Sequence, residues 1–281
     1  MDIIELLKII VFGIVEGFTE WLPISSTGHM ILVEELIQLK VGEDFWNVFK
    51  VVIQLGAILA VVVLYFHKLN PFDAQKTSRQ RQETLVLWIK IAVACIPVVV
   101  VAMPLDDWMD EHLYNGFVVA AMLILYGILF ILVENRNRYL QFPVQRVNQI
   151  DFRTAVFIGL FQLLALVPGT SRSGVTIIGA MLLGCSRSAS AEFTFFLGIP
   201  VMFGASLLKI VKFVTRTEGM FSPLEIFYLL FAMAIAFAVS VYSIKFLMGY
   251  IKRNNFKLFG YYRIVLGVVV LAYFSVTALI G

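Results

Sequence analysis

The chain has 281 residues, of which 60% are hydrophobic and only 15% are charged, and its formal net charge at pH 7 is +3. An ordinary soluble domain carries about 25% charged residues, so this composition excludes a disordered chain, a disulfide scaffold and a soluble enzyme. With a mean hydropathy of +0.90, we expect an all-α polytopic membrane protein. Cys95 and Cys185 lie in apolar stretches without a metal-binding spacing, which argues against redox chemistry.

Six segments are long enough to cross a bilayer, whose apolar core of roughly 30 Å requires about 20 apolar residues per helix. They comprise residues 46–66, 85–103, 116–133, 193–211, 224–248 and 261–280.

Two further apolar regions, 3–39 and 152–185, are interrupted by Gly, Pro, Ser and Thr at residues 22–28 and 167–174. Neither half of either region is long enough to span well, so we predict two re-entrant helix–loop–helix hairpins. Irregular backbone at membrane depth is tolerated only where protein or a wet cavity surrounds it.

The charges of the connecting segments predict the orientation. Lys and Arg are concentrated in residues 67–84, 134–153 and 249–260, whereas residues 104–115 hold four acidic residues and neither Lys nor Arg. Because basic loops face the cytoplasm, six spans place both termini outside. Lys212 and Arg216 then fall in an outer loop, which fits this orientation less well.

The order of these elements predicts an inverted repeat within a single membrane domain of residues 1–281. Each half, about 1–140 and 141–281, contains one hairpin and three spans, and the odd number gives the halves opposite topologies. The sequence Pro23-Ile-Ser-Ser26 resembles Pro168-Gly-Thr-Ser171. Interrupted segments at corresponding positions indicate a binding site near the middle of the membrane.

Two carboxylates, Glu16 and Glu20, precede the first interruption and share one face of a helix, because they are four residues apart. Ionisable groups in the membrane cost about 2.5–3.5 kcal/mol each, which points to function. Two like charges repel unless a cation, an arginine or a shared proton intervenes. The alternative is that one Glu lies at the interface and the other is hydrogen-bonded inside the bundle.

The loop that follows contains three hydroxyls, a glycine and a histidine in the order Ser25, Ser26, Thr27, Gly28 and His29. Hydroxyls and backbone N–H groups at a helix N-terminus can hold an anion. His29 can act as an acid, a base or a nucleophile near neutral pH. The structural alternatives are an N-cap for Ser25 or Thr27 and a packing role for His29.

The second interruption is the segment Pro168-Gly-Thr-Ser-Arg-Ser-Gly-Val-Thr176. The planar guanidinium of Arg172 matches phosphate oxygens, and it has the hydroxyls of Ser171, Ser173 and Thr176 beside it. Alternatively, Arg172 pairs with Glu16 or Glu20 as structural glue. Gln54, inside the first span, suits either this site or a helix–helix hydrogen bond.

Together the two hairpins could form a phosphate-processing site. Carboxylates can hold a divalent cation through their oxygens, and an arginine with such a cation would neutralise a pyrophosphate and its transition state. A hydroxyl or a metal-bound water would attack the terminal phosphorus.

These segments resemble the undecaprenyl-pyrophosphate phosphatase family, which is also known for bacitracin resistance. The resemblance rests on Glu16-Gly-Phe-Thr-Glu20, Leu22-Pro-Ile-Ser-Ser-Thr-Gly-His29, Val52-Ile-Gln-Leu-Gly-Ala57 and Pro168-Gly-Thr-Ser-Arg-Ser-Gly-Val-Thr176, and it covers essentially the whole chain.

The resemblance implies a hydrolase of the bacterial plasma membrane. It would remove the terminal phosphate of undecaprenyl pyrophosphate, giving undecaprenyl phosphate and phosphate, and so recycle the carrier lipid for peptidoglycan synthesis. The resemblance also implies the same fold, a site open to the outer face, and Mg or Ca as an activating cation. It implies a polyprenyl pyrophosphate lipid as substrate, and neither the resemblance nor the composition points to nucleic acid.

The resemblance further implies roles for individual residues. Glu16 and Glu20 would hold the cation or serve as acid and base. Ser26 is the expected nucleophile, with His29 as the rival nucleophile or the base, and water as a third possibility. The pyrophosphate would be bound by Arg172 together with Ser25, Thr27, Gln54, Gly169, Ser171, Ser173 and Thr176.

Two other functions fit parts of the pattern. Type-2 phosphatidic acid phosphatases need a further His after the Arg, and the last histidine here is His112, so that class is excluded. A secondary transporter or flippase for an anionic lipid or solute would use the same Arg and Glu pair on paired broken helices. Such a protein does not obviously need hydroxyls on both hairpins, although transport could coexist with hydrolysis.

Overall fold

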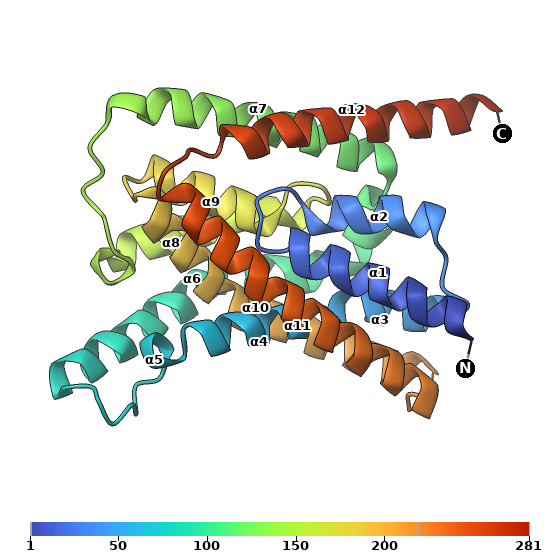
Figure 1. Cartoon of the computed structure of the whole chain (residues 1–281), viewed down its shortest axis with the longest axis horizontal. Helices are drawn as coiled ribbons and strands as arrows, with labels where there is room; N and C mark the ends of the chain where they lie inside the picture. Colours follow the sequence, from blue (N-terminus) through green and yellow to red (C-terminus); the bar gives the residue numbers. More distant parts are fainter. Residues whose placement is uncertain (1, 218–219, 281) are drawn as a thin grey trace.

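The computed structural model describes residues 2–217 and 220–280, apart from the side chains at positions 103, 106, 107, 110, 111, 217 and 280. Apart from an isolated bridge between Val144 and Cys185, the regular elements of these ranges are helices (Figure 1). The α-helices are α1 (Ile3–Thr19), α2 (Ser26–Leu36), α3 (Glu43–Val52), α4 (Gln54–Leu64), α5 (Phe66–Leu69), α6 (Ser78–Leu113), α7 (Gly116–Arg136), α8 (Phe152–Gln162), α9 (Arg172–Leu182), α10 (Arg187–Thr217), α11 (Pro223–Ile251) and α12 (Lys257–Ile280).

Six helical segments are long and apolar enough to span a membrane, which confirms the prediction of an all-α polytopic membrane protein. They are Glu43–Leu64, Ser78–Ala102, Gly116–Tyr139, Arg187–Arg216, Pro223–Ile251 and Lys257–Leu279.

The boundaries correct the sequence prediction in three places. The first span consists of two helices, α3 and α4, which meet at Ile53. There the Gly56 N–H donates to the Ile53 carbonyl, three residues earlier instead of four, so the helix is locally tighter. Residues 104–115 are not a loop, since α6 continues past Pro104 to Leu113. Lys212 and Arg216 likewise belong to α10 and not to a connecting loop.

The prediction of a loop at 104–115 was wrong because it relied on charge, which does not by itself end a helix. The turn is confined to Tyr114 and Asn115, and the Asn115 side chain caps α7 by accepting from the Val118 N–H at 3.0 Å. The side chains of the four acidic residues of this segment lie outside the described part of the chain.

The two interrupted regions form helix–loop–helix hairpins, α1 with α2 and α8 with α9, and a short 3-10 turn (Leu163–Leu166) follows α8. The second helices begin earlier than predicted, at Ser26 and Arg172, so the polar motifs occupy their first turns. Each is capped by the preceding serine, whose Oγ accepts the backbone N–H three residues on: Gly28 at 3.3 Å for Ser25 and Gly174 at 3.1 Å for Ser171. The N-cap alternative for Ser25 is therefore confirmed.

The two halves pack in corresponding ways. The first helix of each hairpin lies against the second long helix of the other half, α1 against α11 and α8 against α6, while α7 and α12 run side by side. Both hairpin helices approach their partners through glycine. A Cβ at Gly17 would lie 2.5 Å from the Ala236 carbonyl oxygen, and a Cβ at Gly159 would lie 2.2 Å from that of Ala94. This pairing is the one that an inverted repeat predicts, and the opposite orientation of the halves stays a prediction.

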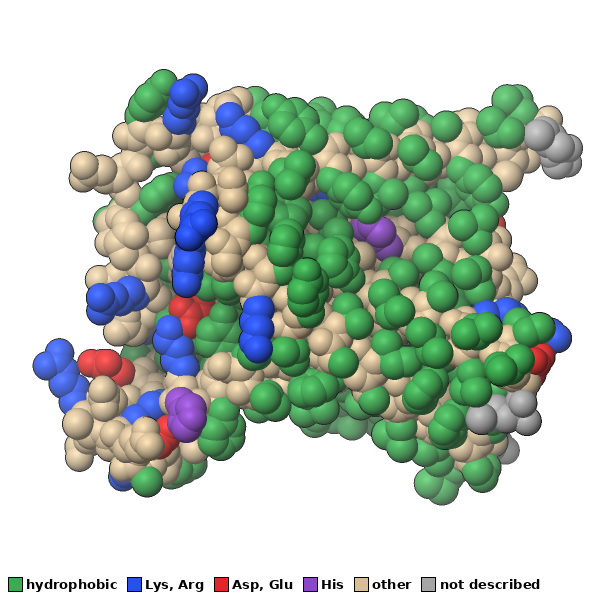
Figure 2. Space-filling view, in the orientation of Figure 1, with side chains coloured by type: hydrophobic (Ala, Val, Ile, Leu, Met, Phe, Trp, Pro, Cys, Tyr) green, Lys and Arg blue, Asp and Glu red, His purple; other side chains and the backbone are tan. Residues whose placement is uncertain are grey.

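Charge is distributed unevenly between the two ends of the helix bundle. The connections from α5 to α6, α7 to α8 and α11 to α12 lie at one end, and the start of α1 and the end of α12 lie at the other (Figure 1). Lys and Arg side chains gather at the end that holds those three connections, on the left of Figure 2. The hairpin loops meet between the two ends.

Candidate active site

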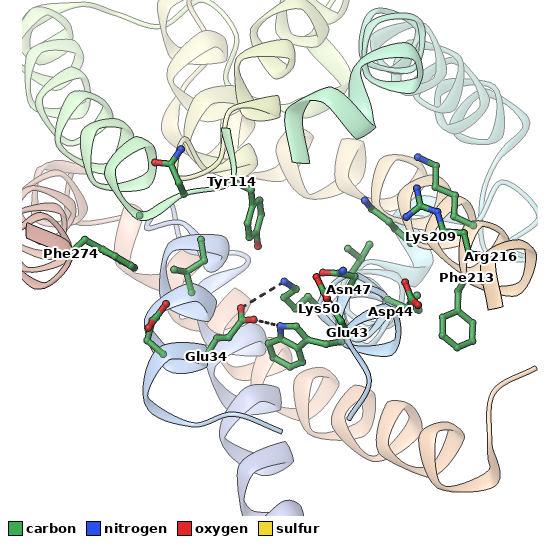
Figure 3. A pocket seen from close by; sticks show the side chains of 18 of the residues that line it. Glu34, Glu43, Asp44, Asn47, Lys50, Tyr114, Lys209, Phe213, Arg216 and Phe274 are labelled. Atoms are coloured by element: carbon green, nitrogen blue, oxygen red, sulfur yellow. Dashed lines mark hydrogen bonds and ion pairs between the residues drawn. The ribbon is translucent and has the colours of Figure 1, made fainter. Parts of the chain in front are cut away.

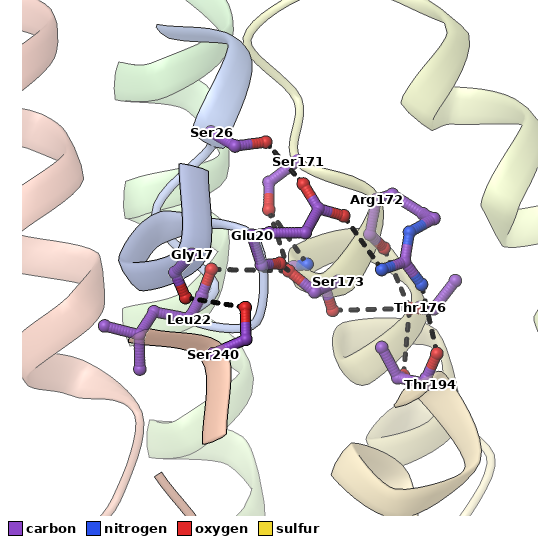
Figure 4. A network of polar contacts seen from close by, with 11 residues as sticks. Gly17, Glu20, Leu22, Ser26, Ser171, Arg172, Ser173, Thr176, Thr194 and Ser240 are labelled. Carbon is purple, nitrogen blue, oxygen red and sulfur yellow. Dashed lines mark hydrogen bonds and ion pairs between the residues drawn. The ribbon is translucent and has the colours of Figure 1, made fainter. Parts of the chain in front are cut away.

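One carboxylate joins the two hairpins (Figure 4). Glu20 ends α1, and its Oε2 accepts a hydrogen bond from the Ser26 hydroxyl at 2.6 Å. Its Oε1 accepts from Nη2 of Arg172 at 3.0 Å, across the junction between the hairpins. The predicted pairing of Arg172 with one of the glutamates is thus confirmed for Glu20.

The Arg172 guanidinium is held from three sides. Besides Glu20, it donates from Nη1 to the Thr194 carbonyl at 3.0 Å and lies over the Trp21 ring, 5.4 Å from its centroid. Gly198 gives it room, because a Cβ there would lie 2.5 Å from Nη1. The Arg172 guanidinium is therefore held in place before any ligand binds, which lowers the entropic cost of ligand binding.

Hydroxyls of the second hairpin support this arrangement from behind. The Ser173 hydroxyl lies 3.1 Å from the Glu20 carbonyl oxygen and 3.2 Å from Oγ of Ser171. Thr176 donates to the Arg172 carbonyl at 2.8 Å and accepts from the Thr194 hydroxyl at 2.9 Å. Ser173 and Thr176 thus brace the backbone around Glu20 and Arg172.

A cavity of about 160 Å³ opens at this junction, and it is lined by seven of the predicted site residues. Its other walls are apolar. A ligand with an anionic head and a hydrocarbon body suits such a cavity, since pockets combine a few placed polar groups with apolar surface. The polar lining consists of Glu20, Ser26, Thr27, Gln54, Gly169, Ser171 and Arg172, and the apolar lining of Ala165, Val167, Pro168, Val201, Met202 and Ala205.

His29 is turned towards α12 and does not line this cavity. Its Nδ1 lies 2.7 Å from the Ser25 carbonyl oxygen, and its Nε2 lies 2.7 Å from the Tyr262 hydroxyl. A carbonyl can only accept, so Nδ1 carries the proton and Nε2 of the neutral ring accepts from Tyr262. Both ring nitrogens of His29 are therefore already hydrogen-bonded away from the cavity. Ser26, in contrast, lines the cavity and donates to a carboxylate.

Glu16 is buried one helical turn before Glu20 and does not line the cavity, and its Oε1 has no hydrogen-bond partner. Other buried polar atoms without a partner also belong to the hairpins or to α12. Such atoms call for an explanation, for which an ordered water or an ion is a usual choice. In the described chain they are Oε1 of Glu16, Nε1 of Trp21, both amide atoms of Gln162, Oγ1 of Thr170, Nε of Arg172 and Nε of Arg263.

A divalent cation fits this donor set only as a two-carboxylate site. No group of three or more His, Cys, Asp or Glu side chains among the described residues could enclose a metal. Glu16 has one oxygen without a partner, and both oxygens of Glu20 are already bonded. Mg²⁺ is commonly bound by one or two carboxylates, with waters and substrate phosphates completing its shell.

A second, larger cavity of about 850 Å³, the vestibule, lies at the end of the bundle that holds the start of α1 and the end of α12 (Figure 3). Charged and aromatic side chains line it. Glu34 accepts a hydrogen bond from the Trp46 indole, and its other oxygen lies 3.7 Å from Nζ of Lys50.

The vestibule lies close to the smaller cavity along α2 and α10. Thr27 and Ala205 line the small cavity, while Ile31 and Lys209, four residues on along α2 and α10, line the vestibule. Four residues are about one helical turn, or roughly 6 Å along the axis, so the two cavities are neighbours along the same two helices.

Four residues around the site escaped the sequence analysis: Trp21, Thr194, Tyr262 and Arg263. A signal existed for one of them, because Arg263 is the only charged residue in the predicted span 261–280. Thr194 and Tyr262 are ordinary residues of the apolar helices α10 and α12, and only the tertiary structure brings them to the site, whereas Trp21 follows Glu20 directly in the turn after α1.

Comparison with known proteins gave consistent matches. Residues 9–269 match the family described as bacitracin resistance protein BacA. A curated protein of Lachnoclostridium phytofermentans, named undecaprenyl-diphosphatase, is 57% identical and is aligned over 98% of each chain. Proteins with the same name from Acetivibrio thermocellus and Enterococcus faecalis are 55% and 52% identical, over 96% of this chain and 98% and 97% of theirs.

Proposed function

The chain belongs to the bacitracin resistance protein BacA family, and from this membership we infer that it is an integral membrane hydrolase acting on undecaprenyl diphosphate. It removes the terminal phosphate and releases undecaprenyl phosphate and inorganic phosphate. The main structural support for this function is the Glu20 carboxylate. It accepts hydrogen bonds from the Ser26 hydroxyl and the Arg172 guanidinium, and all three residues line a cavity whose other walls are apolar.

The cavity suits both parts of the lipid. The Arg172 fork and the hydroxyls of Ser26, Thr27 and Ser171 face the space where a diphosphate would lie, and bidentate guanidinium contacts to phosphate are strong and directional. The apolar wall, which includes Val201 and other small side chains, would accept the first part of the isoprenoid chain.

Ser26 is the nucleophile of this proposal. A phosphate bound at Arg172 competes with Glu20 for the guanidinium, and the Glu20 carboxylate is then free to accept the Ser26 proton. The Ser26 oxygen forms a bond to the terminal phosphorus, and the bond from that phosphorus to the bridging oxygen breaks. Undecaprenyl phosphate leaves with that oxygen, and water then hydrolyses the phosphoserine to serine and phosphate.

The cation of this proposal would be held by Glu16 and Glu20. When bound, Mg or Ca would offset the negative charge that the diphosphate brings into the membrane. The unpartnered Oε1 of Glu16 supports this assignment. Glu16 otherwise bears on catalysis only through its neighbour Glu20.

The proposed orientation has both termini outside and the site open to the outer face. The distribution of charge supports it. Lys and Arg gather at the end of the bundle opposite the start of α1, and basic segments of membrane proteins favour the cytoplasm. The vestibule, at the other end, would then connect the site with the outer medium.

The test is phosphate release from undecaprenyl diphosphate by the purified protein in detergent, with and without a chelator. We expect release that depends on a divalent cation in the wild type and is absent in Ser26→Ala. Release that survives Ser26→Ala would move the nucleophile to His29 or water. If the wild type binds the lipid but releases no phosphate with any cation, hydrolysis is wrong and transport becomes the better explanation.

A further inference from the structure

Arg263 is a fully buried arginine that the proposed mechanism does not use. It lies near the start of α12, and its Nη2 donates to the carbonyl oxygens of Gly169 and Thr170, each at 2.9 Å. Its Nη1 lies 3.4 Å from the Pro23 carbonyl oxygen. One guanidinium therefore binds the loops of both hairpins, whose contacting residues are more than 140 positions apart in the sequence.

The carbonyls that Arg263 binds belong to residues just before the reacting side chains. Gly169 and Thr170 immediately precede Ser171 and Arg172, and Pro23 comes three residues before Ser26. The Gly169 backbone is already constrained, because its φ is +88° and a Cβ there would lie 2.7 Å from the Val119 carbonyl oxygen. By holding these carbonyls, Arg263 restrains the backbone of each loop just before its capping serine.

The charge of Arg263 has no counter-charge among the residues that the structure describes. Among the ion pairs of the described residues none involves Arg263, and its other contacts include the Met122 carbonyl, at 3.4 Å, and the Tyr126 ring, at 5.8 Å. A buried charge without a charged partner is costly. A protein retains such a group where the charge or its hydrogen bonds serve a purpose.

We propose that Arg263 is a positioning residue that joins the two hairpin loops into one site and places a second positive charge behind the bound diphosphate. This proposal rests on the proposed function, because only that function places a diphosphate in the cavity. Arg172 contacts the phosphate from the cavity, and Arg263 acts from the opposite side through the loop backbone. A guanidinium suits this role because its fork can serve several acceptors at once, whereas a lysine offers a single ammonium.

The adjacent residue extends the same contact. Tyr262 holds His29 in the first turn of α2 through the hydrogen bond to Nε2 and a stacked arrangement of the two rings. The first turns of α12 therefore contact the first hairpin at His29 and Pro23 and the second hairpin at Gly169 and Thr170. This explains why a helix outside both hairpins belongs to the site.

The test compares Arg263→Lys, which keeps the charge but not the fork, with Arg263→Met, which loses both. Arg253→Met, at an exposed position, is the matched control. For each purified protein we would measure the thermal midpoint, kcat and KM for the lipid diphosphate, and the inhibition constant of orthovanadate. Hydrogen exchange of residues 20–28 and 167–175 would report on the loops without any catalytic readout.

We expect Arg263→Lys to lower kcat by about a hundredfold, the size typical of a displaced reacting group, with little change in KM or in vanadate inhibition. Arg263→Met should in addition raise KM and weaken vanadate about tenfold, as expected of a lost positive charge near the anion. Both variants should speed exchange in the two loops together. Arg253→Met should match the wild type.

A wild-type kcat in Arg263→Lys, or faster exchange in only one loop, would overturn the joining role. Equal vanadate inhibition in the Lys and Met variants would overturn the electrostatic role. If Arg263→Met does not fold, Arg263→Lys and its exchange pattern still decide the joining role, and its vanadate inhibition must stay near the wild-type value. Failure of the proposed function would look different, because the wild type itself would then release no phosphate.

Discussion

The two hairpin loops have nearly the same backbone and carry different chemistry. Ser25 and Ser171 are the only residues other than glycine with a positive φ in the described ranges, at 74° and 73°. Each caps the helix that follows, because its Oγ accepts the N–H of the glycine three residues later. The residue after the cap is Ser26 in the first loop and Arg172 in the second. One backbone design therefore presents a hydroxyl on one side of the cavity and a guanidinium on the other.

This difference indicates how the work is divided. In the proposed mechanism the first hairpin supplies the reacting groups, Ser26 and Glu20, and the second supplies Arg172 to bind the anion. Neither hairpin holds a complete site, and the Glu20–Arg172 ion pair connects them. Changes at corresponding positions should thus affect different steps, namely bond formation in the first loop and phosphate binding in the second.

The largest expected effect comes from the residue after the first cap. Ser26→Ala should lower phosphate release by at least about a thousandfold, because it removes the attacking oxygen. Ser25→Ala should be much milder, since Ser25 serves as a cap and its hydroxyl does not line the cavity. Steady-state kinetics of the two variants measure this. Equal losses would contradict a single nucleophilic serine.

The corresponding change in the second loop is Arg172→Lys. We expect a loss of about a hundredfold in kcat/KM, because an ammonium cannot hold Glu20, the Thr194 carbonyl and a phosphate as the guanidinium fork does. The loss should appear largely in KM, in contrast to Ser26→Ala. Kinetics over a range of lipid concentrations separate the two parameters, and a kcat/KM close to that of the wild type would remove Arg172 from the site.

The two glutamates sharpen the comparison within the first hairpin. Glu20→Gln should lower activity and raise the cation concentration needed for half-maximal activity, by about tenfold if one ligand of the ion is lost. Glu16→Gln should shift that requirement with a smaller loss of kcat, because Glu16 does not contact Ser26. Titration with Mg²⁺ and Ca²⁺ measures both effects. A cation requirement that neither variant changes would exclude the two glutamates from the ion site.

The smallest effect should be found at the two caps. Ser171→Ala and Ser25→Ala each remove one capping hydrogen bond, which is worth about 1 kcal/mol, and should lower stability to a similar extent. The positive φ is equally unfavourable for Ser and Ala, so backbone strain does not change in either variant, although Ser171→Ala also removes the contact with Oγ of Ser173. Thermal unfolding in detergent measures it, with Ser222→Ala at the exposed cap of α11 as a reference. A clear difference between the loops would contradict their equivalence.

The sequence predicted the spans and hairpins well, because apolar length and breaks by Gly, Pro and Ser are local properties. It also identified the polar part of the cavity lining, but not the apolar part. The residues alone left the nucleophile open between Ser26, His29 and water, and the choice of Ser26 rested on the family resemblance. The sequence could not predict the position of His29, which depends on a hydrogen bond to Tyr262, 233 residues away.

The Glu20–Arg172 ion pair has a consequence for selectivity. Glu20 is tethered beside Arg172, so it competes for the guanidinium at a fixed, high effective concentration. A free anion in solution must displace it without help, whereas a lipid diphosphate would also gain contacts along the apolar wall. Once the terminal phosphate has been removed, the remaining monophosphate has fewer oxygens with which to hold the arginine. We therefore expect Glu20 to recapture Arg172 and to favour release of the product, so that turnover continues while undecaprenyl phosphate accumulates.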